Sequence, residues 1–224
     1  MGYYIDLQKI SLDEYRHKLE TAYLIPSRMI LKEKLDERFG YFKNIGVQNI
    51  QELQQTLKKK DRFAELVKEK WFSEEYLTVL LRELNSIQPK PNRIADFTGI
   101  SVETIARLEK AGIKDTLKLY DWVTTPEKRK QLAGQTGISH DEILELTKLT
   151  DLSRIKWVGA TFARVLYQAG YDTVEKVSKA NYQELYEKIH RLNKEQNLYK
   201  GQIGLNDMNL LVEVANDVSL EIHY

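Results

Sequence analysis

Three short stretches decide the fold of this chain: FKNIGV at residues 42–47, LEKAGI at 108–113 and LYQAGY at 166–171. Each stretch has an apolar residue four positions before its glycine and another directly on either side of it. This pattern is typical of the end of an α-helix, where glycine takes a left-handed conformation at little cost. We therefore interpret Gly46, Gly112 and Gly170 as structural residues that end helices.

The similarity extends beyond these glycines. The first two stretches are separated by 66 residues (112 − 46), and that offset also pairs Leu66 with Leu132, Phe72 with Ile138, Ser73 with Ser139, Leu77 with Ile143 and Leu80 with Leu146. The third stretch follows the same pattern as far as Val177 and then shortens. Similarity at a fixed period is the signature of repeat architectures. The sequence therefore predicts three diverged copies of one helical unit.

The segments around the glycines have helical periodicity. Apolar residues recur at spacings of three and four in residues 12–19, 50–57, 74–84 and 182–192, and no alternating run typical of a strand is present. Helix starts are marked by capping pairs such as Ser139 with Glu142, and by proline in Thr125-Pro126. A polar loop over residues 193–204 precedes a last helix near 207–218. The expected fold class is all-α.

The stretch QPKPN at residues 88–92 separates the first two copies. Proline restricts both itself and the residue before it, so this stretch favours an extended connector over a helix. We predict an N-terminal helical domain with a degenerate repeat over residues 1–88. A second domain, with two repeats and a C-terminal helix, is predicted over residues 93–224.

Composition limits the classes of function. The 224 residues contain no cysteine, which excludes disulfides and thiolate chemistry and fits a reducing compartment. Lys and Arg number 34 against 33 Asp and Glu, so any contact with nucleic acid has to use a local patch. No apolar run is long enough to cross a membrane, and no export signal is recognisable at the N-terminus. A cytoplasmic location is expected.

The stretch IKWVGATFA at residues 155–163 resembles the second half of a helix-hairpin-helix unit, in which a glycine turn opens a helix containing Ala and Leu. Residues 94–113 resemble the same unit. The order of the two units is similar to that in an uncharacterised bacterial family of tandem helix-hairpin-helix repeats, a domain of unknown function, over roughly residues 93–192. The resemblance implies a tandem, SAM-domain-like helical fold, with residues 1–88 holding a weaker copy.

The resemblance also implies how such turns contact DNA. Glycine lets backbone N–H groups approach a phosphate at a helix start, without regard to base sequence. The matching positions are Gly99, Ile100 and Ser101 in the second copy, and Trp157, Val158, Gly159 and Thr161 in the third. Lys156 and Arg164 flank the third turn as candidate phosphate partners. Each copy replaces one of the two usual glycines, by Ser101 and by Trp157. Trp157 would crowd a phosphate approach, but its ring could stack on a base.

Two basic clusters are further candidates for phosphate contact. They occupy nearly equivalent places in the first two copies and consist of Lys58, Lys59 and Lys60, and of Lys128, Arg129 and Lys130. The alternative interpretation is that both clusters are solvated helix entries, diluted by the acidic neighbours Asp61 and Glu127.

No catalytic constellation is recognisable. His17, His140, His190 and His223 have neither the spacing of a helical zinc site nor the neighbours of a catalytic triad, and no glycine-rich phosphate loop exists. We therefore expect no enzyme activity, metal, cofactor or small-molecule substrate. The expected function is sequence-independent binding of DNA or a nucleic-acid complex. The alternative is a protein–protein interaction scaffold that has lost phosphate binding and docks a partner or a second copy through tyrosines, such as Tyr182, Tyr186 and Tyr199, and mixed charges. The other interpretation of these tyrosines is that they are half-buried packing residues.

Overall fold

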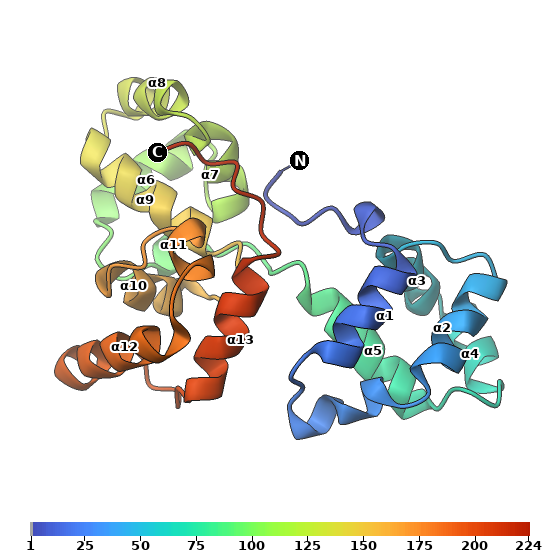
Figure 1. The fold of residues 1–224 in the computed structure, drawn as a ribbon. Helices are drawn as coiled ribbons and strands as arrows, with labels where there is room; N and C mark the ends of the chain where they lie inside the picture. Colours follow the sequence, from blue (N-terminus) through green and yellow to red (C-terminus); the bar gives the residue numbers. More distant parts are fainter. Residues whose placement is uncertain (1) are drawn as a thin grey trace. The chain divides into compact units, whose positions relative to one another are not determined.

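Local capping signals fix where many of the helices begin. In a computed structural model that describes residues 2–224, the Ser139 hydroxyl accepts from the Glu142 amide while the Glu142 carboxylate accepts from the Ser139 amide. Thr125 caps a helix with Pro126 in its first turn. The described residues form helices and turns, with two isolated bridges and no strand, so the predicted all-α fold class is confirmed (Figure 1).

The described chain forms two compact units, one of residues 6–88 and one of residues 2–5 together with 89–224. The expected first domain of residues 1–88 therefore differs from the first unit at its start. Residues 2–5 lie with the second unit because the Tyr3 ring packs against Tyr120 and Ile222. The Tyr3 hydroxyl also forms a buried hydrogen bond of 2.7 Å with that of Thr116.

The first unit contains five α-helices and two 3₁₀ helices (Figure 1). In chain order they are η1 (Leu7–Lys9), α1 (Leu12–Thr21), η2 (Pro26–Lys32), α2 (Leu35–Asn44), α3 (Ile50–Lys58), α4 (Lys60–Val67) and α5 (Glu74–Ser86). Aromatic rings of Phe42, Phe72 and Tyr76 pack together between α2 and α5. The buried Arg38 guanidinium lies 3.7 Å from the centre of the Tyr76 ring and donates to the carbonyls of Ile30 and Glu33.

The second unit contains eight α-helices and one 3₁₀ helix. In chain order they are η3 (Ile94–Asp96), α6 (Val102–Lys110), α7 (Thr116–Val123), α8 (Pro126–Thr136), α9 (His140–Leu152), α10 (Ala160–Gln168), α11 (Val174–Ser178), α12 (Tyr182–Gln196) and α13 (Leu205–Ala215). One apolar core runs from Ile94 to Val218, and the last helix begins two residues before its expected position near 207.

The three glycines of the deciding stretches have the same local structure. Gly46, Gly112 and Gly170 have φ of 89°, 80° and 86°. In each stretch, the residue after the glycine donates its amide hydrogen to the carbonyl of the apolar residue that lies four positions before the glycine. The three N–O distances are 3.1, 2.9 and 3.0 Å. This bond satisfies a carbonyl that the helix end would leave without a partner. Their interpretation as helix ends is confirmed.

A buried polar network holds both end segments of the second unit. Arg154 donates to Asp151 at 3.0 Å, to the Ser219 carbonyl at 2.8 Å and to the Tyr3 carbonyl at 3.3 Å. The other Asp151 oxygen accepts from the Val174 amide and the Tyr224 hydroxyl. Burial raises the pKa of Asp151, although these partners act in the opposite direction. The network fixes the end of α9, from which the next turn starts.

Candidate nucleic-acid interface

The third turn, which joins α9 to α10, is anchored by buried apolar residues. Ile155 and Val158 belong to the core, and the Val158 amide donates to the Ile155 carbonyl at 3.1 Å. Between them, Trp157 has φ of 70°, the left-handed conformation, and its side chain is 48% exposed. A non-glycine residue in this conformation costs about 1–2 kcal/mol. Gly159 then caps α10 with an extended backbone.

The second turn, which precedes α6, has a matching backbone. Gly99 has φ of 89°, Ile100 packs against the core, and Ser101 caps α6 with an extended backbone. In both turns, therefore, a left-handed residue lies two positions before the cap and an apolar residue lies between them. Trp157 thus occupies the place where the second turn has a glycine.

The two helix starts differ in what an anion would meet. At α6, the Ser101 hydroxyl accepts from the Thr104 amide, and the Thr104 hydroxyl donates to Glu142 at 2.7 Å. Hydrogen bonds from Thr104 and Ser139 hold the pKa of Glu142 below its usual value, so this carboxylate is ionised beside the α6 start. Glu103 adds a second acidic residue in the first turn. The α6 start is therefore unfavourable for phosphate.

The α10 start has neither obstacle. Gly159 provides no side-chain cap, and the first turn of α10 contains no acidic residue. The N–H groups of the first turn of a helix have no partner within the helix, and the helix dipole favours negative charge there. Thr161 is exposed in this turn. Lys156 lies in the preceding turn, with its ammonium 4.4 Å from the centre of the Trp157 ring. This end of α10 therefore combines amides and a cation at the surface.

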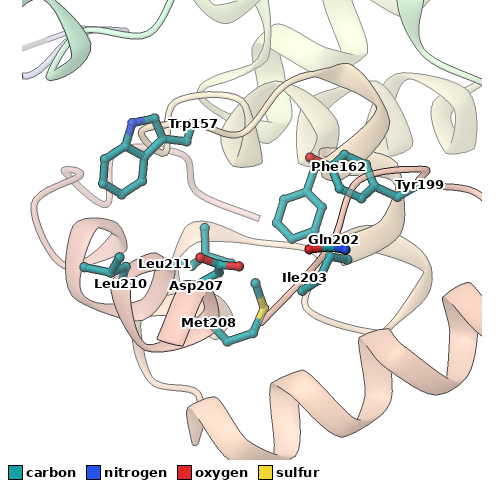
Figure 2. Close-up of a pocket in the computed structure, with 9 residues that line it drawn as sticks. All are labelled: Trp157, Phe162, Tyr199, Gln202, Ile203, Asp207, Met208, Leu210 and Leu211. Atoms are coloured by element: carbon teal, nitrogen blue, oxygen red, sulfur yellow. The ribbon is translucent and has the colours of Figure 1, made fainter. Parts of the chain in front are cut away.

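A hollow of about 290 Å³ opens beside this turn (Figure 2). Figure 2 shows Trp157 on one side, Phe162 and Tyr199 on the other, and side chains of α13 along the base. The lining residues are Trp157, Phe162, Tyr199, Gln202, Ile203, Asp207, Met208, Leu210 and Leu211. Asp207 is the one ionisable acid among them, and its carboxylate accepts from the Gly204 amide at 2.7 Å. The hollow is mainly apolar and aromatic.

Arg164 does not lie at the surface as a phosphate partner would. It is 5% exposed and donates to Glu145 on α9 at 2.6 Å. Its guanidinium also faces the second turn, because a Cβ atom added to Gly99 would lie 3.5 Å from Arg164 Nη2. Arg164 is therefore a buried packing residue: it pairs with α9 and lies against the second turn, where its Nε and Nη2 atoms have no hydrogen-bond partner. Sequence reasoning could not anticipate this because Glu145 is nineteen residues away.

The basic clusters are divided between surface and core. Lys58, Lys59 and Lys60 are exposed at the junction of α3 and α4 in the first unit, and Lys128 and Lys130 are exposed on α8. Arg129 is 7% exposed and donates to the Val123 carbonyl at 2.9 Å, so it supports the end of α7 instead. Within the second unit, α8 lies well away from α10 (Figure 1). The α8 lysines and the third turn therefore form separate surfaces.

The hollow adds residues that sequence analysis did not connect with the turn. Phe162 lies in the motif IKWVGATFA, but Gln202, Ile203, Asp207 and Met208 come from the loop before α13 and from α13 itself. Their distance along the chain left no local signal. Only the amphipathic character of Tyr199 suggested a contact residue.

The described residues form no membrane-spanning helix and no metal-binding cluster. None of their helices is both long and apolar enough to span a bilayer. Within residues 2–224, no group of three or more His, Asp or Glu side chains is placed to hold a metal ion.

Comparison with known proteins places the turns within a recognised family. The family described as Domain of unknown function (DUF4332) matches residues 98–218, a range that contains Gly99, the third turn and the whole hollow. No curated protein and no solved structure matches the chain.

Proposed function

Since the chain belongs to the DUF4332 family, whose function is unknown, we propose a function from its own surface: non-enzymatic, sequence-independent binding of nucleic acid. For the fold, we propose that the helix ends at Gly46, Gly112 and Gly170 and the second and third turns belong to diverged copies of a helix-hairpin-helix unit. Their matching backbone conformations support it. We further propose that the protein acts in the cytoplasm.

The observation that carries the proposal is the start of α10. It combines a helix N-terminus without a side-chain cap, a first turn without acidic residues, and the Lys156 ammonium on the preceding turn. Helix N-termini of this kind bind phosphate through backbone amides and the helix dipole. The α6 start, with Glu103 and Glu142, is expected to contribute less. The exposed lysines of the basic clusters remain candidate secondary contacts.

The experiment is a titration of the full chain with short duplex and single-stranded DNA at low and moderate salt. Binding through phosphates releases counterions, so affinity should fall steeply as salt rises. Lys156→Ala should weaken binding and reduce the dependence of log K on log salt by about one unit. Lys110→Ala is the matched control, because it removes the same charge from an exposed site at the far end of α6.

The alternative function is a protein–protein interaction scaffold. Val102, in the first turn of α6, is 83% exposed, and together with Trp157 it leaves apolar side chains of both turns in solvent. Near-neutral charge also fits this function. No binding to either form of DNA at low salt would reject the nucleic-acid proposal and leave the scaffold.

A further inference from the structure

Trp157 combines a left-handed backbone with a large side chain that is half exposed. Its backbone is left-handed, where glycine would be unstrained, as Gly99 is at the matching place of the second turn. Its large side chain is nevertheless half exposed, and the Lys156 ammonium lies 4.4 Å from the centre of its ring. Strained residues persist where the surrounding structure enforces them, and they concentrate at functional sites. Trp157 is therefore a candidate contact residue for a ligand.

The hollow beside Trp157 indicates what kind of group could enter. At about 290 Å³ it lies at the small end of the range for ligand pockets, which suits one flat group of a few rings. Three of its lining residues, Trp157, Phe162 and Tyr199, are aromatic, and Phe162 and Tyr199 lie with ring centres 5.3 Å apart. The carboxylate of Asp207 would repel a phosphate from the hollow itself. A planar group without negative charge therefore suits the hollow better than a phosphate.

Charge complementarity places an anion next to that planar group. Lys156 and the first residues of α10 adjoin Trp157 in the chain, and none of Lys156, Ala160 and Thr161 lines the hollow with Asp207. A nucleotide has the corresponding arrangement of a planar base and an adjoining phosphate. A base inside a duplex is paired and stacked and cannot reach a recessed ring, whereas a base of a single strand can.

We propose that the third turn binds an unpaired nucleotide, with its base stacked in the hollow of Trp157, Phe162 and Tyr199 and its phosphate at the start of α10. This inference rests on the proposed nucleic-acid function and narrows it to single strands or unpaired ends. Stacking on aromatic side chains tolerates any base, so the preference is for single-stranded form and not for sequence.

The test compares two fluorescein-labelled single strands of about 12 nucleotides, one with normal bases and one abasic throughout, by anisotropy at low salt. The full-length protein should bind the base-bearing strand at least about five-fold more tightly, the effect of one stacked base. Trp157→Gly, which relieves the strained backbone, should bring the ratio of the two affinities close to one. Trp157→Phe keeps an aromatic ring and should retain most of the ratio.

Val102→Ala is the matched control, because it removes an exposed apolar side chain beside the other turn and should leave the ratio unchanged. Equal, salt-sensitive binding of both strands by the unaltered protein would overturn the base site while leaving phosphate binding intact. An unchanged ratio in folded Trp157→Gly would overturn it equally. Absence of binding to any strand would overturn both this inference and the proposed function.

Discussion

Asp151→Ala should be one of the most destabilising substitutions in the second unit. The Asp151 carboxylate accepts hydrogen bonds from Arg154 at 3.0 Å, from the Val174 amide at 2.9 Å and from the Tyr224 hydroxyl at 3.0 Å. Its removal leaves the Arg154 guanidinium, which is 2% exposed, without its carboxylate partner. Removing one partner of a buried ion pair costs about 3–5 kcal/mol, and we expect a loss of unfolding free energy in that range.

A milder variant separates the parts of this network. Tyr224→Phe deletes one of the three hydrogen bonds and keeps the ion pair, so it should cost about 1.5 kcal/mol. Asp121→Ala, at an exposed position on α7, is the control and should stay within about 0.5 kcal/mol of the unaltered protein.

The assay is equilibrium unfolding in urea, followed by circular dichroism and by tryptophan fluorescence. Trp122 and Trp157 report on the second unit, whereas Trp71 lies in the first. A loss below about 1 kcal/mol for Asp151→Ala would contradict the reasoning, because a buried arginine without its carboxylate cannot be that inexpensive. A Tyr224→Phe loss as large as that of Asp151→Ala would contradict the assignment of the main effect to the ion pair.

Three further predictions concern other parts of the molecule. Burial alone would raise the pKa of Asp172, but hydrogen bonds and charges from two lysines hold it below the ordinary 3.8. The ionised Asp172 therefore stabilises the folded state above about pH 4, and this stabilisation is lost as the pH falls below that value. In urea unfolding, the loss of stability caused by Asp172→Asn should therefore become smaller as the pH falls towards about 3. Arg164→Ala should lower the unfolding free energy by about 2–4 kcal/mol, because it leaves Glu145 without its partner. The fraction of this variant that stays folded should bind DNA normally. Loss of DNA binding by the folded variant would instead indicate that Arg164 contacts phosphate directly. Gly112→Ala should destabilise by about 1 kcal/mol because its φ is 80°, whereas Gly134→Ala inside α8 should stabilise by about 0.5 kcal/mol, and thermal denaturation of both tests the sign.

The sequence was informative wherever structure depends on neighbours within one helical turn. The capping pair of Ser139 and Glu142, and the glycine that ends α6, are defined by residues at most five apart, so their patterns predicted the geometry. The alignment of Trp157 with Gly99 also paired two positions that share a left-handed backbone in the structure.

The site was less predictable because its chemistry depends on long-range packing. Arg164 and Arg129 look like surface cations in the sequence, but both enter the core because a carboxylate and a carbonyl from other helices receive them. The hollow forms only because α13 returns to α10 some forty residues later along the chain. Charge counting could not separate the α6 start from the α10 start, since Glu142 reaches α6 from α9.

The hydrogen bonds from Arg154 to Tyr3 and to Ser219 have a consequence for the order of folding. Residues 2–5 are synthesised well before residues 116, 120 and 222, where the groups that bury Tyr3 lie. Residues 6–88 can fold as soon as they have been made, whereas the second unit closes only after residue 222 has been made. Contacts between such distant residues form slowly. In nascent chains, residues 6–88 should therefore be protected from hydrogen exchange long before residues 2–5 are.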